Sequence, residues 1–373
     1  MAVTFGWPPS RLPSVHSGFG WTKPLLRIPD TPSAHHFPVT TIESPATQAP
    51  TPRNIPVVRR VSDRVFRGIL IAGGLAAFII LSGIFGYLAK SATPVLKAFG
   101  FEFFTGSVWY SGDGLLASEG SVDPAQFGLL PMLWGSLLIA FVAVAIALPL
   151  AVGVALAVTY MIPKKLALPL TIFIDLVAAI PSIVFGLWGF YVLMPHGALW
   201  AQWLNTNLSW VPFFQVEFPA FEQSPFMAGI VLAIMITPII AAVAREIFAA
   251  VPRDLITGAQ ALGASRWTLI RDVVLPFGRG GIIGGAMLGL GRALGETIAV
   301  FFVLQLFTEG TNWFHILESS GGSVASLIVS RFGEAQPLEL SALFGAGLAL
   351  FLITLLANAG ATAIVAASTR KRK

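Results

Sequence analysis

The chain has 373 residues, of which 55% are hydrophobic and only 11% charged, and its formal charge at pH 7 is +5. Roughly a quarter of the residues in a soluble domain are charged, so this composition excludes an ordinary soluble fold and favours a membrane protein. The sequence holds no cysteine, which excludes disulfides, thiolate nucleophiles and cysteine-ligated metals. Its basic residues lie in short clusters beside apolar runs, a pattern typical of membrane topology and not of nucleic-acid binding.

Residues 1–65 are rich in Pro, Ser and Thr and are predicted to form a disordered cytoplasmic tail. The tail contains His16, His35 and His36, but nothing in the sequence fixes their geometry, so we predict no metal site there.

Long apolar runs over residues 66–367 predict an all-α integral membrane protein with about six transmembrane helices. The spans are expected at 68–89, 127–161, 166–194, 226–244, 281–307 and 340–367. Arginines before the first span, the pair Lys164–Lys165 and the basic C-terminus 368–373 are expected on the cytoplasmic side. We therefore predict a multi-pass protein of the bacterial cytoplasmic membrane with both termini in the cytoplasm.

The segment between the fourth and fifth spans, residues 245–280, is predicted to form two short amphipathic helices joined at a glycine corner. Pro252 suits a first helical turn, Gly263 stops that helix, Ser265 caps the next, and Pro276 closes it. Such a knob could be gripped by a soluble partner. A surface hairpin lying on lipid headgroups fits the periodicity equally well.

The fifth span carries glycines at every fourth position, Gly281, Gly285 and Gly289, a pattern that lets transmembrane helices approach closely. Arg292 and Glu296 each follow one of these glycines by seven residues, so we expect both charges on the same packed face. Arg292 lies about 16 Å along the helix from Gly281, near the bilayer midplane, where a charge needs a partner or a wet cavity.

These charges admit three interpretations. Arg292 and Glu296 could form a buried ion pair that fixes helix register. Alternatively, Arg292 could donate to a passing oxyanion while Glu296 and Asp175, in the third span, hold its guanidinium or switch partners as the path opens. A proton relay is the third interpretation.

The string from Gly291 to Val300, GRALGETIAV, resembles the signature of phosphate-importer permeases of the PstC type. Residues 179–182 (AIPS) and 185–189 (FGLWG) match the same pattern, and the resemblance covers residues 66–367. It implies the ABC importer permease fold and makes Arg292, Glu296, Asp175 and Thr297 candidates for the substrate path.

The segment 252–276 resembles the EAA loop, the helical coupling element of ABC-importer permeases. Thr257 stands where the family has its glutamate. The positions expected to contact ATPase subunits are Ala259, Gly263, Ala264, Arg266, Trp267, Leu275 and Pro276.

The resemblance implies a transport subunit for inorganic phosphate, with separate ATP-binding subunits in a dimer, a sister permease of the PstA type and an extracytoplasmic phosphate-binding protein. The sequence lacks a G-x-x-x-x-G-K-[ST] phosphate loop, and no cofactor is expected. Alternatives are a permease for sulfate or molybdate, or an autonomous secondary transporter or channel. A membrane enzyme is disfavoured because all five histidines fall outside the predicted spans.

Overall fold

The computed structural model describes residues 61–111, 125–217, 219–304, 311, 313–319 and 321–370. The chain divides into a unit Met1–Arg64 and a unit Val65–Lys373, and the fold below is that of the second unit. The predicted disordered tail lies outside the described residues except for its last five positions.

Among the described residues, six helices are long and apolar enough to cross a membrane, which confirms the predicted all-α membrane fold. These candidate spans are Arg64–Ser91, Leu130–Met161, Ser182–Leu208, Pro225–Ala249, Arg266–Gly295 and Pro337–Gly360. They belong to α1 (Val61–Ser91), α4 (Leu130–Leu156), α6 (Ser182–Trp188) with α7 (Met194–Leu208), α8 (Pro225–Ala249), α10 (Arg266–Leu269) with α11 (Leu275–Gly295), and α14 (Pro337–Arg370).

The third span differs from the predicted range 166–194. A separate helix, α5 (Lys164–Ala178), ends before Pro181, and α6 starts at Ser182. Proline has no backbone N–H to continue the helix, and it disfavours helical geometry in the residue before it. The 15 residues of α5 rise about 22 Å, less than the hydrocarbon thickness, so the longer helix Ser182–Leu208 is the candidate span.

Each π-helical turn in the part of the chain that the structure describes ends two residues before a proline. The turns cover Ala157–Met161, Gly189–Leu193 and Ile270–Val274, ahead of Pro163, Pro195 and Pro276. At Pro195 and Pro276 the helix continues, and the wider turn accommodates the proline ring, which would otherwise clash with a carbonyl of the preceding turn. The prediction that Pro276 closes its helix is therefore wrong, and one continuous helix runs from Arg266 to Gly295.

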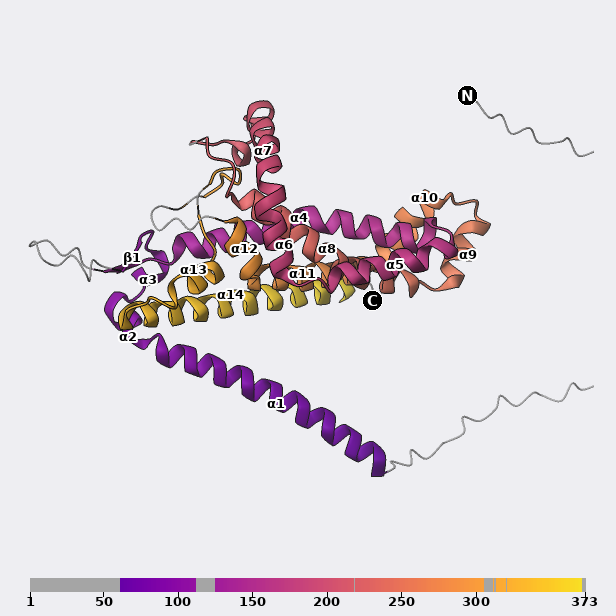
Figure 1. The fold of residues 1–373 in the computed structure, drawn as a ribbon. Coiled ribbons are helices and arrows are strands. Elements are labelled where there is room, and N and C mark those ends of the chain that lie inside the picture. Colours follow the sequence, from indigo (N-terminus) through magenta and orange to yellow (C-terminus); the bar gives the residue numbers. More distant parts are fainter. Residues whose placement is uncertain are drawn as a thin grey trace, which may run out of the picture. The chain divides into compact units, whose positions relative to one another are not determined.

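Helix α8 lies at the centre of the bundle, against α4 on one side and α11 on the other (Figure 1). Gly229 of α8 meets Val142 of α4 so closely that a Cβ would not fit. Isoleucines of α8, including the fully buried Ile236 and Ile240, fill the same core. This packing makes α8 the support on which the candidate site is built.

At the end of the bundle away from α9 (Arg253–Ala261), a small cap covers the first turns of α14 (Figure 1). The cap contains α2 (Thr93–Phe99), α3 (Glu102–Thr105) and the paired strands β1 (Trp109–Tyr110) and β2 (Gln126–Phe127). Glu339 of α14 is 3% exposed, and its Oε1 accepts hydrogen bonds from the Trp109 indole (3.3 Å) and the Ser111 hydroxyl (2.9 Å). The buried carboxylate thus fastens β1 to α14.

Candidate transport path and coupling site

The string GRALGETIAV of the fifth span, residues 291–300, surrounds a break in the helix. Helix α11 ends at Gly295, Glu296 is extended with φ −75° and ψ 127°, and α12 (Ile298–Val303) starts after Thr297. The Thr297 hydroxyl donates to the Gly295 carbonyl at 3.4 Å, which satisfies one of the carbonyls left open at the helix end. The predicted continuous span 281–307 is therefore divided at Glu296 and Thr297.

The glycines of α11 face α8. A Cβ on Gly289 would lie 2.7 Å from Cδ1 of Ile240, and one on Gly285 would lie 3.4 Å from Cγ1 of Val243. The buried stripe then continues to Ala293, four residues after Gly289. Small residues at this spacing let the two backbones approach closely.

Arg292 does not lie on this packed face, which corrects the prediction from the sequence. Its side chain is exposed, whereas Ala293 is buried. Helix α11 contacts α8 through residues spaced four apart. Four residues rotate by about 400°, so each successive contact residue lies about 40° further around the helix. A position seven residues after Gly285 therefore falls beside the stripe.

Arg292 and Glu296 form no ion pair within the described residues. A pair four residues apart requires an unbroken helix to place both side chains on one face. Here α11 ends between them, and the extended backbone of Glu296 directs its side chain elsewhere. The register-fixing ion pair, one of the three interpretations of these charges, is not present among the described residues.

Asp175 is also separated from Arg292. Its Oδ1 lies 3.7 Å from Nη2 of Arg245, so the carboxylate of α5 pairs with the end of α8. In this structure Asp175 therefore does not hold the Arg292 guanidinium. The break at Ala179–Pro181 sets the course of α5 along α8, which the sequence pattern of a single span does not reveal.

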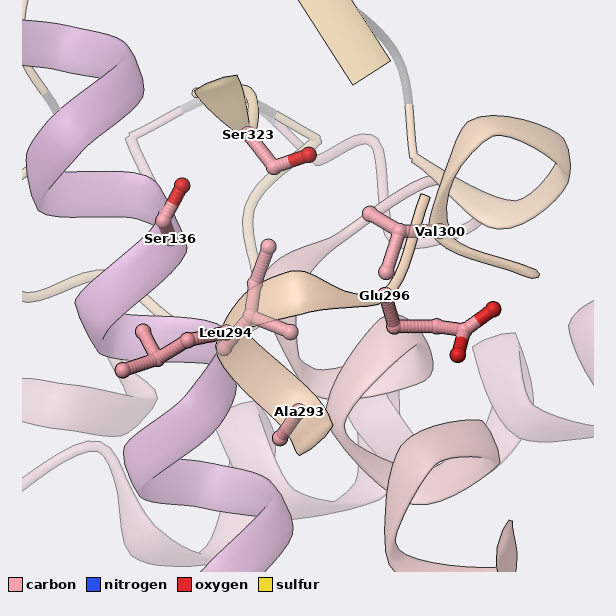
Figure 2. Close-up of a pocket in the computed structure, with 7 residues that line it drawn as sticks. Ser136, Ala293, Leu294, Glu296, Val300 and Ser323 are labelled. Atoms are coloured by element: carbon pink, nitrogen blue, oxygen red, sulfur yellow. The ribbon is translucent and has the colours of Figure 1, made fainter. Parts of the chain in front are cut away.

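Glu296 lines a small pocket together with residues from three other elements (Figure 2). The lining residues are Ser136, Ile139, Ala293, Leu294, Glu296, Val300 and Ser323. Figure 2 shows the Glu296 carboxylate extending away from the hydroxyls of Ser136 and Ser323. Sequence reasoning missed both serines, although a hydroxyl inside the apolar span of α4 is a signal that could have drawn attention to Ser136.

The predicted knob is present between α8 and α11. Helix α9 starts after Pro252, Gly263 takes the positive φ of 78° that favours glycine, and the Ser265 hydroxyl caps α10 by accepting from the Thr268 N–H at 3.2 Å. These local predictions are confirmed. Because α10 continues into α11, the knob is joined rigidly to the helix that carries Arg292.

The knob presents apolar side chains outward. Leu262 is 90% exposed and Trp267 is 64% exposed, while Ile256 and Ala259 pack inward against a core around Phe248. The remaining coupling candidates lie in the same short segment: Ala264, Arg266, Leu275 and Pro276.

Thr257, which replaces the family glutamate, is exposed on α9. Its hydroxyl donates back to the carbonyls of Arg253 (3.0 Å) and Asp254 (3.3 Å). This position therefore offers its own helix a hydrogen bond and offers a partner no charge.

Comparison with known proteins gives the class first. Residues 147–373 match the family described as "Binding-protein-dependent transport system inner membrane component". A chain of a bacterial alginate ABC transporter, solved in complex with an alginate pentasaccharide-bound periplasmic protein, has the same fold with a TM-score of 0.51. That comparison covers 81% of this chain and 96% of the other at 16% identity, so it shows the fold alone. The chain belongs to the binding-protein-dependent transport permeases, which are multi-pass inner-membrane proteins.

More similar relatives place the chain within that family. It is 40% identical over 320 residues to a Mycobacterium leprae protein named "Phosphate transport system permease protein PstC", across 84% of this chain and 97% of the relative. It is 38% identical over 308 residues to "Phosphate transport system permease protein PstC 2" of Mycobacterium tuberculosis, across 82% and 92% of the two chains. The probable PstC of Methanocaldococcus jannaschii is 34% identical over 311 residues. The resemblance to PstC permeases found in the sequence is confirmed.

Proposed function

We propose that the chain is the transmembrane permease subunit of an ATP-driven importer that moves inorganic phosphate across the cytoplasmic membrane. The similarity to PstC proteins at 38–40% identity over more than four-fifths of the chain carries this proposal. The six candidate spans supply the scaffold that such a subunit needs.

Arg292 is the proposed contact for the anion. A guanidinium in a membrane span is not stable against lipid, so an exposed arginine there faces a protein partner or a water-filled path. Its planar donor fork suits the oxygens of phosphate. No acidic side chain of the described residues pairs with it, so within this part of the chain no carboxylate competes with an anion for its donors. Glu296 and Thr297 at the helix break are proposed to line the same path.

The partners follow from the same surfaces. The exposed apolar side chains of the knob, Leu262 and Trp267, are proposed to dock separate ATP-binding subunits that hydrolyse ATP. The sequence of this chain contains no phosphate loop of its own. A sister permease of the PstA type would cover the face of Arg292, and an extracytoplasmic phosphate-binding protein would deliver the anion. The knob and both termini are then cytoplasmic.

Uptake of labelled phosphate by cells that depend on this importer tests the proposal. Arg292→Gln should lower uptake at least tenfold at normal membrane levels, because amide donors lack the positive charge. Arg279→Gln is the matched control, an exposed arginine on the same helix about 20 Å away, and should transport normally. Unchanged uptake in Arg292→Gln would remove this residue from the path.

Two further measurements separate the alternatives. Excess sulfate or molybdate should not compete with labelled phosphate, since competition would point to another oxyanion as substrate. Uptake should stop when the ATP-binding subunits are deleted, whereas persistence would indicate an autonomous transporter or channel.

A further inference from the structure

The first turns of α4 hold the chain at the start of α13 (Val324–Arg331). The Trp134 indole N–H donates to the Trp313 carbonyl at 2.8 Å. Two residues later, the Ser136 hydroxyl accepts the Val324 N–H at 3.0 Å. Ser136 is only 7% exposed, so this hydrogen bond is shielded from water.

Between these contacts, Gly135 lies directly against the backbone of Gly322. A Cβ on Gly135 would collide with the Gly322 carbonyl oxygen, so a larger residue would push the two segments apart. Gly321 has a φ of 99°, a conformation that favours glycine and turns the chain into α13. We call the contacts of Gly135 and Ser136 with Gly322 and Val324 the α13 latch.

The latch lies at the pocket that contains Glu296. Ser136 of the latch and Ser323, which lies between Gly322 and Val324, both line this pocket with Val300 (Figure 2). The Ser323 and Ser326 side chains form a reciprocal capping box, so the first turn of α13 is held together as one piece. Release of the latch would therefore move this turn away from α4 as a unit and uncover the pocket.

We propose that the α13 latch gates the transport path at the end of the bundle away from α9, with Ser136 as its positioning residue. The proposal rests on the proposed function, since a gate needs a path. The latch consists of one shielded hydrogen bond and one glycine contact, so a conformational change driven by partner subunits is sufficient to open it. Val300, which lines the pocket with Ser136 and Ser323, is 2% exposed in this structure.

The absence of native cysteines allows a single reporter, Val300→Cys, in the complete complex reconstituted in liposomes. A membrane-impermeant maleimide added from the α13 side should label it slowly at rest and faster in complexes trapped with ATP and vanadate. Adding Ser136→Ala should raise the resting rate about fivefold, the factor expected from losing one net hydrogen bond. Ser136→Thr, which keeps the hydroxyl, should restore the slow rate.

Two further variants serve as a control and as a second test of the latch. Ser330→Ala removes a hydroxyl that donates to the Leu327 carbonyl within α13, and it should leave the labelling rate unchanged. Gly135→Ala should raise the rate as Ser136→Ala does, and it serves as the second test if that variant fails to fold. Equal rates in the Ser136, Gly135 and Ser330 variants, or no difference between resting and trapped complexes, would overturn the latch.

Phosphate uptake by the same complexes separates this proposal from the one on which it rests. If the labelling rate changes in the latch variants as expected but the complex does not transport phosphate, the proposed substrate is wrong and the proposed gate is supported. If phosphate is transported and the latch variants do not change the labelling rate, only the proposed gate is refuted.

Discussion

Replacing Gly289 by alanine tests whether the α11 glycines set the distance to α8. The added Cβ would lie 2.7 Å from Cδ1 and 2.9 Å from Cγ1 of Ile240, and a second isoleucine stands 3.6 Å away. Ile240 is fully buried, so it has little room to yield. Overpacking of this kind costs about 1–3 kcal/mol.

Gly284→Ala is the matched control on the same helix, because a Cβ there meets nothing within 4 Å. Both substitutions gain about 1 kcal/mol in helix propensity, so this gain cancels when the two variants are compared. A difference of about 2 kcal/mol corresponds to roughly 2–3 °C in melting temperature for a chain of 373 residues.

The assay is thermal unfolding of the isolated chain in detergent, followed by size-exclusion chromatography of the remaining folded protein. We expect Gly289→Ala to melt below Gly284→Ala by that margin. If the two variants melt together, the close approach of α11 to α8 does not depend on glycine, and the packing argument fails.

Two further predictions concern the cap and the knob. Glu339→Ala leaves the Trp109 and Ser111 donors without their acceptor and should cost about 1–3 kcal/mol in the same thermal assay, whereas Glu334→Ala at an exposed position should change little. Leu262→Asp should reduce ATP-dependent uptake at normal membrane levels by placing a charge on the exposed apolar tip of the knob, while Asp254→Asn on α9 should not; normal uptake in Leu262→Asp would contradict docking at the tip.

The sequence predicted the knob well because its signals are local. A glycine that takes a positive φ and a serine that caps a helix act on their own neighbours, so Gly263 and Ser265 are readable without tertiary contacts. The course of the helix beyond Pro276 was not readable. A π-helical turn absorbs the proline there, and the proline signal alone predicts a stop.

The charged residues show where the sequence pattern becomes insufficient. The sequence pattern places Arg292 on the packed face, and its possible pairing with Glu296 assumes one straight helix. In the structure, α11 packs on α8 along residues four apart, and this row does not include Arg292. The helix also ends at Gly295, before Glu296. Rotation and breaks of a helix depend on what packs against it, and periodicity does not contain that information.

The sequence by itself determined the membrane class, the number of spans and the family, because apolar length and short motifs are properties of contiguous residues. Only the tertiary structure decided that Asp175 pairs with Arg245, that Arg292 is exposed, and that Ser136 meets Val324. Ser136 and Val324 are 188 positions apart, and a contact over such a separation exists only once α4 and α13 have packed together.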